Sequence, residues 1–160
     1  ALINALKVRY NPVPDEDDNK PIYQNTEAYE KALNIVYLQY SDNPCVCCLY
    51  AESVMNYSPW RLWNLNTGIP SSVAITARTV LEKGLKLAPL HPGLNHFYIH
   101  LMEMSPTPEI ALHNCHILQP LIRDAGHLIH MPSHIYVLCG LLIIIINIII
   151  LLFNFVICYL

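Results

Sequence analysis

The sequence predicts an all-α protein: an antiparallel array of helical hairpins followed by a long apolar C-terminal helix. No window alternates apolar and polar residues between hairpin turns, so strands are not expected. Apolar residues instead recur at helical spacing in segments of roughly 11–17 residues. Short turns rich in Pro and Gly join these segments, which makes consecutive helices antiparallel neighbours. No charged residue follows Asp124, so the end of the chain differs in composition from the rest.

The elements follow from local signals in chain order. Residues 1–10 are expected to be the end of a preceding helix, and residues 11–24 an acidic, proline-rich loop. A helical array is expected over residues 25–139. Its helices are predicted at 26–40 with Thr26 as the cap, 44–56 starting at Pro44, 72–87 capped by Ser71 or Ser72, 94–104, 108–120 and from His127 onward.

Composition limits the class of function. Nine Lys and Arg residues against twelve Asp and Glu residues give a formal charge of −3. We therefore expect no nucleic-acid partner, because phosphate binding needs a basic surface. Six cysteines show no evenly spaced disulfide framework, which favours free thiols in a reducing compartment and hence a cytoplasmic location. The chain starts at Ala1 inside a helical pattern without a signal peptide, so we expect a fragment that lacks repeats at both ends.

Residues 140–160 form an uncharged, strongly apolar tail. About 20 predominantly apolar residues suffice to span a bilayer, so the tail is a candidate transmembrane helix and would anchor the protein by its C-terminus. The alternative is that this run, in which isoleucines flank Asn147, is low-complexity sequence at the end of a truncated gene model. Both interpretations stay open at this point.

All eight histidines lie between His91 and His134. In HPGLNHFYIHLME, His96, His100 and Glu103 are spaced i, i+4 and i+7, and so share one helix face. In GHLIHMPSHIY, His127, His130 and His134 are spaced i, i+3 and i+7 and share another face, provided that the helix continues through Pro132. His91 immediately precedes the first of these helices and is a further candidate.

Two interpretations of the two histidine faces compete. If the helices face each other, the imidazoles and the Glu103 carboxylate can bind a divalent transition metal such as zinc, copper or iron. In that case Glu103 is a third ligand or a general base. Alternatively, the side chains form a polar network in which each imidazole is hydrogen-bonded and sets the helix register.

Three aromatic residues, Trp60, Trp63 and Tyr57, also have two interpretations. They either form an aromatic ledge that docks peptides or pack the core of a turn.

The array is also similar to helical-hairpin repeats of about 34 residues, because Ala77 and Ala111 recur at this distance in successive helices. The strings LYAESVMNYSPWRLWNLNTGIP, HPGLNHFYIHLMEMSPTPEIAL and AGHLIHMPSHIYVLCG resemble a family of tetratricopeptide-repeat (TPR) domain proteins of uncharacterised function. The resemblance covers roughly residues 1–140. It implies an all-α repeat fold and brings no established chemistry. After Gly140 this chain departs from the family pattern, which continues with a polar helix.

These observations favour a TPR-like scaffold that binds a protein or peptide partner on its concave face. One alternative is a metal-binding protein or metal-dependent enzyme that uses His96, His100, Glu103, His127, His130 and His134. The other is a tail-anchored membrane adaptor, which adds residues 140–160 as the anchor. No catalytic residue is assigned from the sequence, and an enzymatic role is not favoured.

Overall fold

The computed structural model describes residues 1–10, 25–121, 125–142, 144 and 146. Within these residues the chain folds into α-helices and one 3-10 helix, and the only β pairing is an isolated bridge between Trp63 and Pro70. The prediction of an all-α protein is therefore confirmed for this part of the chain. The helices are α1 (Leu2–Tyr10), α2 (Thr26–Tyr40), α3 (Pro44–Met55), α4 (Ser72–Leu87), α5 (Pro92–Met102), η2 (Pro108–Ala111), α6 (Leu112–Leu121) and α7 (Gly126–Leu138).

Side-chain caps mark the start of α3, α4 and α5. The Asn43 side chain accepts hydrogen bonds from the backbone N–H groups of Cys45 and Val46, with Pro44 as the first residue of α3. Ser71 caps α4 in the same way by accepting from Ala74 N. Such caps satisfy N–H groups that have no partner inside the helix. The helix boundaries near residues 44 and 72 are thus encoded locally.

Three details differ from the sequence-based expectations. Thr26 lies inside α2, and Asn25 occupies the cap position, so Thr26 is not the cap. Helix α5 spans Pro92–Met102 rather than 94–104. It begins at Pro92 because the His91 side chain caps its N-terminus. The segment that starts at Pro108 first forms a 3-10 turn and becomes α-helical only at Leu112.

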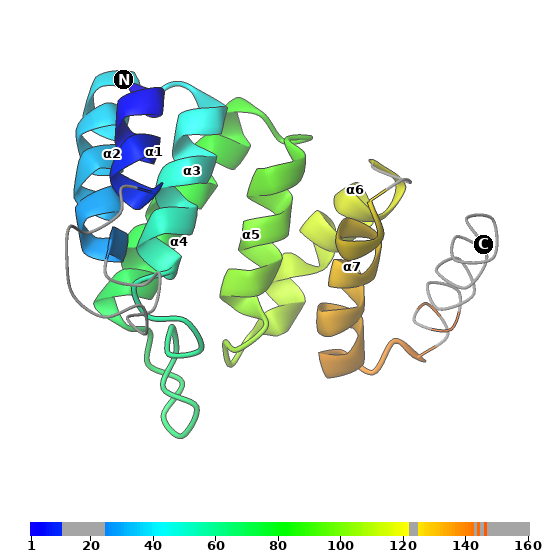
Figure 1. Ribbon diagram of the computed structural model, residues 1–160. Helices are drawn as coiled ribbons and strands as arrows, with labels where there is room; N and C mark the ends of the chain where they lie inside the picture. The colour runs from blue at the N-terminus through cyan, green and yellow to red at the C-terminus, as the bar shows by residue number, and fades with distance from the viewer. Residues whose placement is uncertain (11–24, 122–124, 143, 145, 147–160) are drawn as a thin grey trace.

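The helices follow one another side by side (Figure 1), and each α-helix contacts the next one in the chain. In addition, α3 contacts α5 and α5 contacts α7, so alternate helices also lie against each other. The core is continuous along this row and includes Ala51 of α3, Leu81 of α4, Ile99 of α5 and Ile135 of α7, all fully buried. The contact between α5 and α7 is the one that positions the histidines.

Two predicted segments lie almost wholly outside the described residues. The acidic loop is one of them, since residues 11–24 are not described. The long apolar C-terminal helix is the other: α7 ends at Leu138, and beyond Leu142 only residues 144 and 146 are described. Among the described residues, no helix is both long and apolar enough to cross a membrane.

A buried pair of asparagines joins α5 to α6. Asn95 is fully buried and donates from Nδ2 to the carbonyl oxygens of Pro89 and His91, each at 2.9 Å. Its Oδ1 accepts a hydrogen bond from Asn114 Nδ2 of α6, also at 2.9 Å. Every polar atom of the Asn95 side chain has a partner, so these hydrogen bonds offset the cost of burying it. The pair thereby holds the start of α5 in place. His96 is the next residue in the chain.

We predict that Asn114→Ala lowers the free energy of unfolding by about 1–3 kcal/mol, because it leaves the buried Asn95 Oδ1 without a partner. Chemical denaturation followed by circular dichroism at 222 nm measures the change. The control is Asn66→Ala, which truncates an exposed asparagine and is expected to change stability by less than about 0.5 kcal/mol. Equal effects of the two substitutions would contradict a stabilising role for the buried pair.

Candidate metal centre

Helix α5 carries the first group of predicted site residues. His96 and His100 lie one helical turn apart, and Glu103 follows the last residue of the helix. Their rings are adjacent, with the centroids of His96 and His100 separated by 4.7 Å. All three side chains are only partly buried, so they border the solvent while the opposite face of α5 packs in the core. The i, i+4 and i+7 spacing thus places them together, as the sequence predicts.

Helix α7 carries the second group. It continues through Pro132, which is buried, so His127, His130 and His134 share one face. Their ring centroids are 4.9 Å apart for His127 and His130, and 5.4 Å apart for His130 and His134. The helix starts at Gly126, which places His127 at its N-terminal end.

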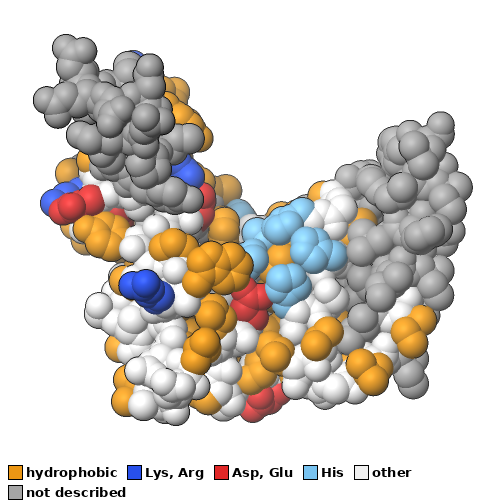
Figure 2. Space-filling model, turned by 60° about the horizontal axis from the view of Figure 1, so that its bottom comes forward, with side chains coloured by type: hydrophobic (Ala, Val, Ile, Leu, Met, Phe, Trp, Pro, Cys, Tyr) orange, Lys and Arg blue, Asp and Glu red, His pale blue; other side chains and the backbone are white. Residues whose placement is uncertain are grey.

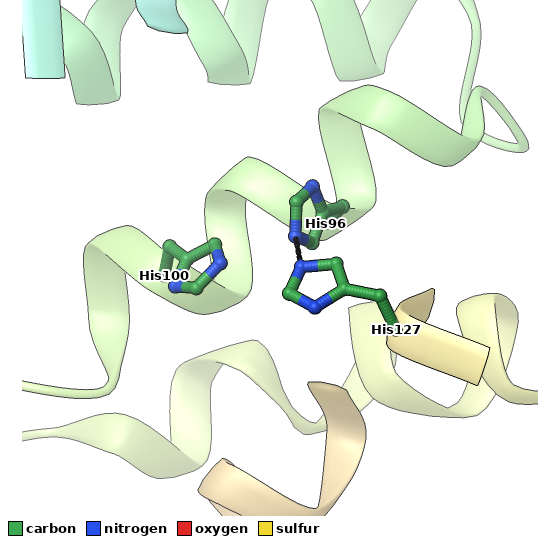
Figure 3. Close-up of side chains that lie close together, drawn as sticks. All are labelled: His96, His100 and His127. Carbon is green, nitrogen blue, oxygen red and sulfur yellow. Dashed lines mark hydrogen bonds between the residues drawn. The ribbon is translucent and has the colours of Figure 1, made fainter. Parts of the chain in front are cut away.

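The two groups meet where α5 packs against α7. The Nε2 atoms of His96 and His127 are 3.0 Å apart (Figure 3), and the ring centroids of His100 and His127 are 6.1 Å apart. One ring nitrogen from each of His96, His100 and His127 lies within 4.8 Å of the other two. Two imidazole nitrogens bound to a tetrahedral zinc ion at 2.0–2.1 Å are about 3.3–3.4 Å apart. The three nitrogens are therefore close enough for one ion to bind them once the rings turn toward one another.

The Glu103 carboxylate connects the two helices. Its Oε1 lies 3.1 Å from His100 Nδ1, and its Oε2 is hydrogen-bonded to His134 Nδ1. A histidine whose Nδ1–H donates to a carboxylate keeps Nε2 free as a ligand, and such carboxylates commonly orient the histidines of metal sites. Glu103 therefore orients His100 and is not a member of the triplet. His134 also lies outside the triplet and contacts Glu103.

Electrostatics keep part of the cluster uncharged. Burial, followed by the nearby imidazoles of His100, His127 and His130, lowers the pKa of His96 to about 4. Burial, followed by the neighbouring imidazoles, also lowers the pKa of His127. Burial alone would raise the pKa of Glu103, but hydrogen bonds from His100 and His134 outweigh it and hold this pKa below its usual value. At neutral pH His96 is thus the neutral imidazole that a metal ion requires.

Several histidine side chains form one patch on the face shown in Figure 2, with acidic and hydrophobic side chains beside it. His127 is exposed, whereas His96 and His100 are partly buried. A ligand set that is open on one side leaves room for a water molecule or a substrate at the ion, which is the arrangement of catalytic rather than structural zinc sites. The triplet is therefore accessible from solvent.

The other histidines are not members of the triplet. His91, the further candidate, caps α5: its Nδ1 accepts from Leu94 N at 3.2 Å, and its Nε2 lies 3.5 Å from Cys45 Sγ. His113 and His116 are exposed on α6, and the His116 ring lies 5.9 Å from the Tyr136 ring. His130 is next to the triplet without being one of its three members.

The aromatic residues of the loop after α3 divide between the two interpretations. Trp63 is buried, and its Nε1–H donates to Leu101 O at 2.7 Å, so it packs the loop against α5. Trp60 and Tyr57 are exposed. Sequence reasoning did not connect Trp60 with the histidines, yet it lines a pocket together with His100 and Glu103. No signal in the sequence indicates this proximity, because it depends on how the loop folds back.

Comparisons of the chain with protein-family models, curated proteins and solved structures give no match.

The lowered pKa values predict that acid destabilises the fold. Below pH 6.5 the unfolded chain protonates His96, whereas the folded chain takes up this proton only near pH 4, so the unfolding free energy falls between pH 7 and pH 5. Glu103 adds to the loss only below about pH 4.5, because its pKa is also lowered on folding. We expect His96→Gln to show a smaller decrease between pH 7 and pH 5.

Denaturant unfolding curves at pH 7, 6 and 5, recorded with a chelator present, measure this difference. Identical pH dependence in the wild type and in His96→Gln would show that His96 is not desolvated as the structure indicates.

Proposed function

We propose that this protein binds one divalent transition-metal ion, zinc being the simplest case, through His96, His100 and His127. The observation that supports the proposal is the placement of three ring nitrogens within 4.8 Å of one another from two helices. Imidazole ligands suit zinc, copper, iron and nickel, and a tetrahedral zinc site with three histidines retains one position for water.

The surroundings of the triplet support the same function. The Glu103 carboxylate holds His100 by Nδ1, which leaves His100 Nε2 available to the ion. The lowered pKa of His96 removes the competition from protons at neutral pH. A bound zinc ion would lower the pKa of its water to near 7 and so supply a nucleophile, which makes a metal-dependent hydrolytic enzyme the reaction class that this site fits.

Titration of the full chain with zinc by calorimetry tests the proposal. We predict one zinc ion per chain for the wild type. His96→Ala and His127→Ala each remove a ligand and are expected to lower the affinity by more than 100-fold. Glu103→Gln removes only the orienting carboxylate and is expected to lower the affinity by roughly 10–100-fold.

The matched control is His116→Ala, which removes an exposed histidine of α6 that lies outside the triplet. It is expected to bind zinc as the wild type does. Absence of stoichiometric zinc in the wild type, or an equal loss of affinity in His116→Ala, would overturn the proposal.

A TPR-like scaffold for a protein or peptide partner is the second candidate. The contacts of α3 with α5 and of α5 with α7 support it, because stacked helical hairpins bring alternate helices together. The first residues of α5 and α7, Pro92 and Gly126, are also separated by about 34 residues, the length of such a repeat. This role is compatible with a cytoplasmic location. Its membrane-anchored form depends on residues 140–160, nearly all of which lie outside the described residues.

The two candidates predict different results in the zinc titration. A scaffold whose histidines only hydrogen-bond to one another has no reason to bind one zinc ion per chain. A scaffold role alone would therefore remain if the wild type bound no zinc.

A further inference from the structure

A pocket of about 200 Å³ is lined by His100, one member of the histidine triplet. His100 and Glu103 line it, so the pocket and the candidate metal centre share the His100 side chain. The rest of its wall comes from α3, from the loop after α3 and from α5 and the turn that follows, and is mainly apolar: Met55, Trp60, Phe97 and Met104. An apolar pocket that ends in a few polar groups is the usual form of a small-molecule site.

The size and lining of the pocket favour a single aromatic ring. Two aromatic side chains, Trp60 and Phe97, can stack on a ring or meet its edge. The sulfur atoms of methionines also make favourable contacts with aromatic rings, and Met55 and Met104 both face this pocket. An aliphatic chain would not use either preference.

The charges of the wall favour a neutral hydroxyl group over an acid. Glu103 and Glu52 both line the pocket, and Glu52 pairs with Arg9 at 3.3 Å. None of the described residues that line this pocket is Lys or Arg. A carboxylate accepts hydrogen bonds and does not donate them, so it selects a ligand that carries a donor such as O–H.

Trp60, which lines the pocket, has an unusual backbone conformation. Its backbone has φ = 65°, the left-handed conformation that Gly and Asn adopt more easily than other residues. It follows Pro59 in a turn closed by a hydrogen bond from Arg61 N to Ser58 O at 3.1 Å, and a turn of this kind usually has Gly or Asn at that position. The side chain is 76% exposed, so core packing does not offset the free-energy cost of this backbone conformation. Strained residues of this kind cluster at binding sites.

We propose that the pocket binds a neutral monocyclic phenol, with its ring against Trp60 and Phe97 and its hydroxyl group at His100 and Glu103. The proposal rests on the proposed function, because the hydroxyl group lies beside the ion that the histidine triplet would hold. It specifies the ligand class of that site: small hydroxylated aromatic compounds.

Calorimetric titration of the zinc-loaded full chain with phenol tests the proposal, with anisole as the matched ligand that lacks the O–H donor. We expect phenol to bind at least ten-fold more tightly than anisole, and removal of zinc with a chelator to weaken phenol binding. Equal affinities for phenol and anisole, or phenol binding that does not depend on zinc, would overturn the proposal. If zinc binds and phenol does not, the phenol site alone is wrong; if zinc does not bind, the proposed function fails first.

Trp60→Asn is the decisive variant, because asparagine accepts the left-handed backbone and removes the ring. We expect at least a ten-fold loss of phenol affinity with a thermal midpoint no lower than that of the wild type. Tyr57→Ala is the control: Tyr57 is an exposed aromatic residue of the same loop that does not line this pocket, and its removal is expected to leave phenol binding unchanged. Unchanged phenol affinity in Trp60→Asn, or an equal loss in Tyr57→Ala, would refute the assignment.

Discussion

The Glu103 carboxylate, held between His100 of α5 and His134 of α7, is the interaction on which the histidine site depends. The same two helices also meet through the contact between His96 Nε2 and His127 Nε2. One carboxylate sets the ring orientation of a histidine on each helix, and its negative charge offsets the repulsion that so many imidazoles would create if protonated. Without it, the His96–His127 contact would still bring the helices together, but His100 would have no partner that directs its free nitrogen toward the other two rings.

The site also depends on rigid support from the opposite side of α5. The buried Asn95–Asn114 pair and the indole of Trp63, bonded to Leu101 O, attach α5 near both of its ends. His91 contributes by capping the helix. Partly exposed rings on a well-anchored helix keep their positions while remaining accessible to solvent, and an ion or a ligand site needs both properties. The pocket that His100 lines is also lined by Trp60, so the loop after α3 lies next to the histidine site.

Part of this site could be predicted from the sequence. The spacing of His96, His100 and Glu103 defines one helix face regardless of the fold, and the same holds for His127, His130 and His134 once the helix continues through Pro132. Which three of these residues share the reach of one ion could not be predicted, because it depends on the angle and register at which α5 crosses α7. His91 was a reasonable candidate by proximity in sequence, but a residue just before a helix can equally cap it, and here it does. The left-handed conformation of Trp60 has no sequence signal, since the usual residues at such a position are Gly and Asn.

X-ray absorption spectroscopy at the zinc edge, on the full chain loaded with one zinc ion, tests directly whether the triplet holds a metal ion. We expect a first shell of nitrogen and oxygen atoms at about 2.0–2.1 Å from zinc, with the outer-shell scattering typical of three imidazole rings. In the His116→Ala protein this spectrum should be the same, and in His127→Ala one imidazole should be lost. A first shell that contains sulfur at about 2.3 Å, or a spectrum without imidazole scattering, would contradict it.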